Sequence, residues 1–63
     1  MTQKELLYVE DAIGHESIII DVINDTIDKL EDEELVEFME NEEEKHTKMK
    51  EELIGLLEGL SNE

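Results

Sequence analysis

Three residues that could hold a metal ion stand out because they interrupt or adjoin apolar helical patterns. Glu16 falls within an apolar pattern in the first half of the chain, and His46 falls within a second pattern. Glu43 precedes His46 by three residues, and side chains three apart project from the same side of a helix. A carboxylate and an imidazole at that spacing can hold one divalent cation together. The pattern therefore predicts a metal site with Glu16, Glu43 and His46 as ligands.

Two neighbouring residues are alternative ligands. Glu42 lies on the strict apolar repeat of the second pattern, whereas Glu43 fits the Glu-x-x-His spacing, and a rotation of about 100° separates the two. His15 adjoins Glu16 and is a candidate extra ligand or a partner that orients one. The alternative without a metal is that His46 packs at a helix seam while the carboxylates reach into water.

The elements that must position these residues are two helices. In the first half of the chain, apolar positions recur in alternating steps of three and four residues, which is typical of one face of a helix. This first stripe consists of Leu6, Val9, Ile13, Glu16, Ile20, Ile23, Ile27 and Leu30. Beyond it the phase breaks, and a new stripe starts one residue out of register. The second stripe consists of Leu35, Met39, Glu42, His46, Met49, Leu53, Leu56 and Leu60.

The break between the stripes predicts an antiparallel helical hairpin in a single domain, 1–63. We expect helices over about 3–30 and about 35–60, with a turn at about 31–34. Thr2 and Glu5 have the spacing of a capping box, and Asp32 is a candidate N-cap for the second helix. The competing interpretation is one continuous helix roughly 90 Å long with a phase slip in its seam.

A two-helix hairpin cannot enclose a core, so the all-α fold predicted is a pair of hairpins forming a ferritin-like four-helix bundle. A turn centred near residue 31 places Glu16 level with His46. A homodimer, or a higher homo-oligomer, then supplies Glu16, Glu43 and His46 twice. Four carboxylates and two neutral imidazoles balance the charge of two divalent cations, and this ligand set suits iron or manganese, with zinc as an alternative.

Charge and composition exclude several functions. The 63 residues include 20 acidic and 5 basic side chains, for a formal net charge of −15. Nucleic-acid and anionic membrane surfaces both require basic side chains, so we expect neither as a partner. There is no Cys, no apolar run long enough for a membrane span, and no signal-peptide pattern at the start. We therefore expect a cytoplasmic protein.

Glu16, the acidic segment Glu31 to Leu35, and the segment Asn41 to His46 together resemble the ferritin-like superfamily of di-iron carboxylate proteins. The resemblance is to its short two-helix members, the encapsulated ferritins and the small spore-coat-like proteins, and it spans about Leu6 to Gly59. It implies that Glu16, Glu43 and His46 are metal ligands in a di-iron site. It also implies ferroxidase activity, in which two Fe(II) ions react with dioxygen or peroxide, and assembly into a dimer or larger ring. A further protein partner or an encapsulating shell is left open.

The rival function comes from another class. An acidic helical interaction module, such as a nucleic-acid mimic or a structural dimer, would use its carboxylates at the surface and bind no metal. In that case Glu16 is expected to point outward.

Overall fold

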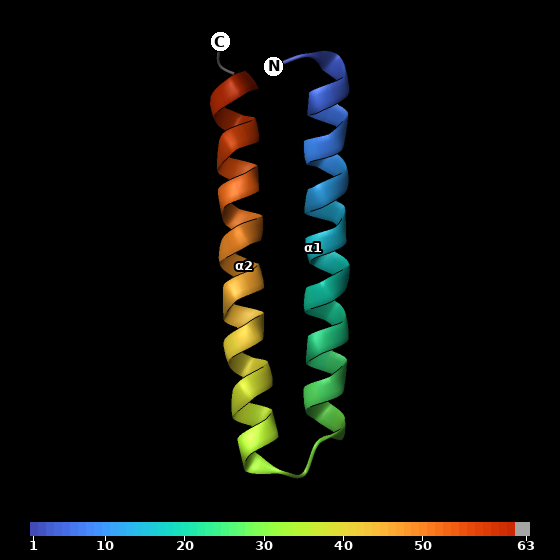
Figure 1. Cartoon of the computed structure of the whole chain (residues 1–63), viewed down its shortest axis with the longest axis vertical. Helices are drawn as coiled ribbons and strands as arrows, with labels where there is room; N and C mark the ends of the chain where they lie inside the picture. Colours follow the sequence, from blue (N-terminus) through green and yellow to red (C-terminus); the bar gives the residue numbers. More distant parts are fainter. Residues whose placement is uncertain (62–63) are drawn as a thin grey trace.

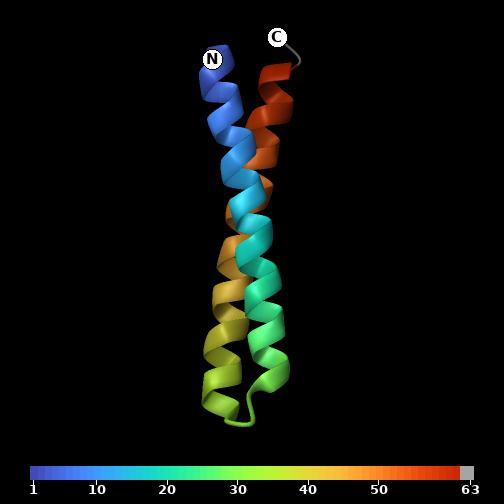
Figure 2. The same cartoon turned by 90° about the vertical axis from the view of Figure 1, so that its right-hand side faces the viewer.

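The fold is an antiparallel hairpin of two helices, as the sequence predicts. The computed structural model describes residues 1–61, in which α1 spans Gln3–Lys29 and α2 spans Glu33–Ser61. Figure 1 shows the two helices side by side with both termini at the same end. The molecule measures 47 × 15 × 11 Å, so the alternative of one continuous rod is wrong. In the view of Figure 2 the two helices are inclined to one another and cross near mid-length.

Both helix starts are capped by the residues that the sequence indicates. The Thr2 hydroxyl accepts the Glu5 backbone N–H at 3.1 Å, and Glu5 Oε1 accepts the Thr2 backbone N–H at 2.8 Å. At the start of α2, Asp32 Oδ1 accepts the backbone N–H groups of Glu34 at 2.9 Å and Leu35 at 3.1 Å. Each cap satisfies N–H groups that have no partner within the helix.

The connection between the helices is shorter than the predicted 31–34 turn. Helix α1 ends at Lys29, and Leu30 adopts an extended conformation while its N–H donates to the Ile27 carbonyl at 3.2 Å. Because Asp32 caps α2, that helix begins at Glu33, two residues before the expected start. No described residue has a positive φ, so the turn requires no glycine.

The first stripe faces α2 along its whole length. All of its positions are buried or half-buried, and Ile23, at 6% exposure, is the only buried hydrophobic side chain among the described residues. The hairpin therefore has a seam between two helices and almost no enclosed core. Burial in the seam alone contributes little for a chain of this length.

The second stripe meets α1 only in part. Met39, His46 and Leu53 are half-buried, but Leu35, Met49 and Leu56 are exposed in the hairpin. A second line on α2 is also half-buried and consists of Val36, Glu43, Lys50 and Leu57, and Glu42, Thr47 and Ile54 are half-buried beside these two lines. Helix α2 is therefore rotated so that the seam lies between the two lines. The last predicted position, Leu60, lies outside the described side chains.

No helix within residues 1–61 is both long enough and apolar enough to cross a membrane.

Candidate functional site

The centre of the candidate site is a direct contact between Glu16 and His46. His46 Nδ1 lies 2.6 Å from Glu16 Oε2, and the side chains are 23% and 15% exposed, respectively. The contact joins residues thirty apart in sequence and confirms that the two lie at the same level of the hairpin. Two polar side chains on apolar stripes thus satisfy one another inside the seam.

The geometry of this pair allows two chemical states. If His46 is protonated, the pair is an ion bridge, and both ring nitrogens are donors. If His46 is neutral with the proton on Nδ1, the ring donates to Glu16 and leaves the lone pair of Nε2 free to bind a metal ion. In that second state Glu16 fixes the tautomer and orientation of the ring, which is how carboxylates commonly support histidine ligands.

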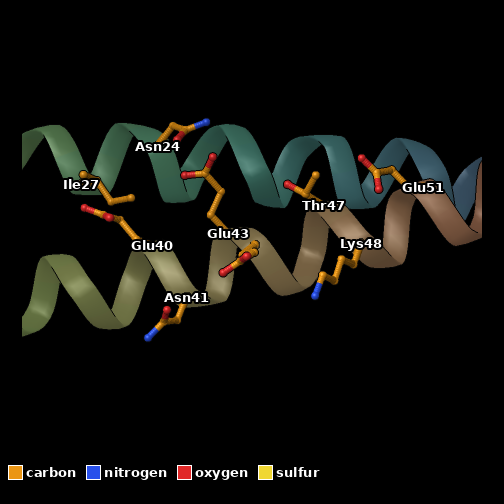
Figure 3. A pocket seen from close by; sticks show the side chains of 9 residues that line it. Asn24, Ile27, Glu40, Asn41, Glu43, Thr47, Lys48 and Glu51 are labelled. Carbon is orange, nitrogen blue, oxygen red and sulfur yellow. The ribbon is translucent and has the colours of Figure 1, made fainter.

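Glu43 lies in the seam one turn before His46, but it is held by a different partner. With the Asn24 amide oriented so that its nitrogen faces the carboxylate, Nδ2 donates to Glu43 Oε2 at 2.6 Å and to Oε1 at 3.3 Å. In Figure 3 the Glu43 side chain extends from α2 towards α1 near Asn24. This interaction spans the seam on one side and keeps Glu43 half-buried.

The two alternative ligands lie on or beside the seam. Glu42 is half-buried, with a side chain 30% exposed, and Lys45 Nζ donates to its Oε1 at 3.1 Å. His15 is exposed on α1, next to Glu16 in sequence. The structure therefore brings Glu16 and His46 together and gives each of the nearby carboxylates, Glu42 and Glu43, its own nitrogen donor.

A shallow groove lies along the Asn24 side of the seam. It has a volume of about 730 Å³ and is lined by Asn24, Ile27, Glu40, Asn41, Glu43, Glu44, Thr47, Lys48 and Glu51 (Figure 3). Four of these residues are glutamates. The groove is open to solvent, and its acidic character suits a cation or a basic side chain better than an anion.

Within one chain the ligands do not form a complete metal site. Among residues 1–61, no three side chains of His, Cys, Asp or Glu come together closely enough to hold a metal ion. A metal site in this hairpin therefore needs ligands from a second chain or a movement of Glu42 or Glu43 away from its present partner.

Asn24 contacts a candidate ligand, and the sequence pattern did not single it out. It follows Ile23, a stripe position, and so lies just off the stripe. The level relation that placed Glu16 opposite His46 puts residue 24 opposite residue 38, about one and a half turns from Glu43, so the spacing did not indicate this contact. The long Glu43 side chain spans the offset.

Comparison with known proteins adds nothing to the geometry. No protein-family model, curated protein or solved structure matches this chain. The resemblance to the ferritin-like superfamily accordingly stays a prediction from the residues.

Proposed function

We propose that the chain is a homodimeric metal-binding protein whose metal site is built around the Glu16–His46 pair. The supporting observation is the 2.6 Å contact between a carboxylate and an imidazole in the seam of the hairpin. Partly buried polar groups on apolar stripes satisfy one another in the metal-free chain, and a carboxylate and an imidazole in contact are also suited to ligate one cation together.

A second copy supplies what a single chain lacks. Each hairpin offers Glu16, His46 and one further carboxylate, Glu42 or Glu43, so a dimer offers four carboxylates and two imidazoles. This ligand set is suited to iron or manganese, and zinc also accepts it. Iron held there in a di-metal site would be the substrate of oxidation by dioxygen or peroxide, so we propose iron handling with ferroxidase activity as the specific function.

The charge of the chain supports a cation as the natural ligand. A net charge of −15 on 63 residues is strongly self-repulsive. Divalent cations bound between carboxylates reduce this repulsion, so metal binding and folding should be coupled.

One observation favours the rival proposal, an acidic helical interaction module. Glu16, Glu42 and Glu43 each have a nitrogen partner within the chain, so none of them requires a metal. On the other hand, Glu16 faces His46 across the seam and does not point outward. The two functions therefore make opposite predictions for metal content.

Metal titration of the purified protein separates these proposals. We expect Fe(II), added without oxygen, and Mn(II) to bind at two ions per dimer and to raise the melting temperature of the metal-free protein. His46→Ala should reduce the affinity by at least about 10-fold, because it removes the imidazole ligand. Glu44→Gln is the matched control, since it removes one exposed carboxylate from the same helix.

The same titration identifies the further carboxylate ligand. Glu42→Gln and Glu43→Gln each remove one charge, and the variant with the greater loss of affinity marks the ligand. Absence of stoichiometric binding and of any thermal shift in the wild type would overturn the metal proposal and favour the interaction module.

A further inference from the structure

The two edges of the seam differ in composition. The Asn24–Glu43 hydrogen bond marks one edge, which we term the closed edge. On α1, Asn24 follows the stripe residue Ile23 whereas Val22 precedes it, so the two project from opposite sides of the helix. On α2, Thr47, which lines the same groove as Asn24 and Glu43, follows His46, whereas Lys45 precedes it.

The positions that face the partner helix are those of the first stripe on α1 and 36, 39, 43, 46, 50, 53 and 57 on α2, with 60 next in the same steps. Residues that precede these seam positions therefore share the other edge, on both helices. We define the open face as the sixteen residues on this side: Glu5, Tyr8, Ala12, His15, Ile19, Val22, Thr26, Lys29, Leu35, Phe38, Glu42, Lys45, Met49, Glu52, Leu56 and Gly59. Most of the large exposed hydrophobic side chains lie here. They are Tyr8, Ile19, Val22, Leu35, Phe38, Met49 and Leu56; among the side chains that the structure describes, the large exposed hydrophobic residues elsewhere are Met1, Leu7 and Ile18.

The open face is also depleted of acid. It carries three of the chain's 20 acidic residues, Glu5, Glu42 and Glu52, against two lysines. Glu5 is engaged in the capping box, and Glu42 is paired with Lys45. Two copies of a chain with a net charge of −15 repel one another over most of their surfaces, and this nearly neutral face is where they can approach closely.

The exposed area matches what a dimer interface requires. The hairpin exposes 5023 Å², whereas a folded monomer of 7.3 kDa exposes about 4,200 Å². The excess of roughly 800 Å² equals the area that each partner buries in a standard protein interface.

The Glu16–His46 pair lies at the middle of this face along its length. Glu16 is the central residue of α1, and His46 adjoins Thr47, the central residue of α2. A twofold axis lying in the open face, either along the hairpin or across its middle, therefore brings the pairs of two copies to the same height.

We propose that the open face is a self-association surface and that a second copy of this chain covers it. The inference deepens the proposed function, because it names the surface of the homodimer on which that function rests, but it does not require a metal. It also favours Glu42 as the further carboxylate, since Glu42 lies on the open face whereas Glu43 lies in the seam and accepts from Asn24 at the closed edge.

Paired lysine substitutions test the surface. Val22 and Leu56 lie on the open face and are 58% and 53% exposed; Ile18 and Leu7 lie off it and are 60% and 55% exposed. We expect sedimentation equilibrium of the metal-free wild type, in chelator and about 0.5 M salt to screen repulsion, to give twice the 7.3 kDa chain mass. The variant Val22→Lys/Leu56→Lys should dimerise at least about 100-fold more weakly.

The control variant Ile18→Lys/Leu7→Lys changes the net charge equally and should keep its dimerisation constant within about threefold. Circular dichroism must show equal helix content for both variants at high protein concentration. A wild type that stays monomeric at about 1 mM, or equal weakening by the two variants, would overturn the inference. A dimer that binds no metal would instead overturn only the proposed metal function.

Discussion

The side chains along the two edges of the seam differ in what they contact. The closed edge pairs an amide with a carboxylate across the helices, and acidic residues surround it in contact with water. The open face leaves aromatic and aliphatic side chains exposed and has few carboxylates. One edge is therefore satisfied by contacts within the chain, whereas the other is the surface that we propose a second copy covers.

The Glu16–His46 pair lies between these edges, and its replacement should have the largest effect on stability. His46→Leu leaves the partly buried Glu16 carboxylate without its partner, and we expect the free energy of unfolding to fall by about 1–3 kcal/mol. Glu16→Leu/His46→Leu removes both polar groups and extends the apolar stripe, so its stability should equal or exceed that of the wild type. Urea denaturation of metal-free protein at a fixed chain concentration measures both.

The control for this pair is His15→Leu, an exposed substitution beside Glu16 that should change stability by no more than about 0.5 kcal/mol. If the double variant is destabilised as much as His46→Leu, the pair contributes more than mutual satisfaction of two polar groups. If the double variant is fully stable but no longer binds metal, the Glu16–His46 pair serves metal binding and is not needed for the fold.

The next largest effect tests the closed edge alone. Asn24→Asp replaces the donor to Glu43 by a second carboxylate at hydrogen-bond distance, and we expect a loss of about 1 kcal/mol in stability. Repulsion between the two carboxylates is screened by salt, so part of the loss should be recovered at about 1 M salt. Thermal melts at low and high salt provide the measurement.

Asn41→Asp is the matched control for this substitution. Asn41 is exposed on α2 and lines the same groove, and its change to Asp adds the same charge. We expect Asn24→Asp to be the more destabilising and to leave dimerisation unchanged, because the closed edge lies away from the open face. A shift in the dimerisation constant specific to Asn24→Asp would mean that the two edges are not independent.

The sequence was sufficient to predict α1 and the level of the site. Alternating steps of three and four residues determine which face of α1 is apolar, and a turn near residue 31 sets Glu16 opposite His46. The caps Thr2 and Asp32 were equally predictable, because each places a side-chain acceptor next to free helix N–H groups.

The rotation of α2 could not be predicted in the same way. The line of Met39, His46 and Leu53 has a neighbouring line on each side, one with Met49 and Leu56 and the other with Val36 and Leu57. The hairpin packs the side with Val36 and Leu57 against α1, and the periodicity of one chain does not distinguish that seam from the centre of a larger bundle. For the same reason, spacing alone did not decide between Glu42 and Glu43.

The smallest expected loss of stability is at the start of α1. This cap lies at the end of the hairpin, so its loss should affect neither edge of the seam. Thr2→Ala removes the hydroxyl that accepts the Glu5 N–H, and we expect a loss of about 0.5–1 kcal/mol in stability, with metal affinity and the dimerisation constant per folded chain unchanged.

The Glu5 carboxyl gives the same cap a pH dependence. Its pKa is lowered because the Thr2 backbone N–H donates to the carboxylate, and the Thr2 side chain adds to the effect. A lowered folded-state pKa stabilises the fold above the ordinary pKa of glutamate, and this contribution disappears as the pH falls through the folded-state value. Thermal melts of wild type and Glu5→Gln between about pH 6 and pH 3 should therefore converge at the acid end. If they stay parallel, Glu5 contributes to the cap equally in its charged and neutral forms.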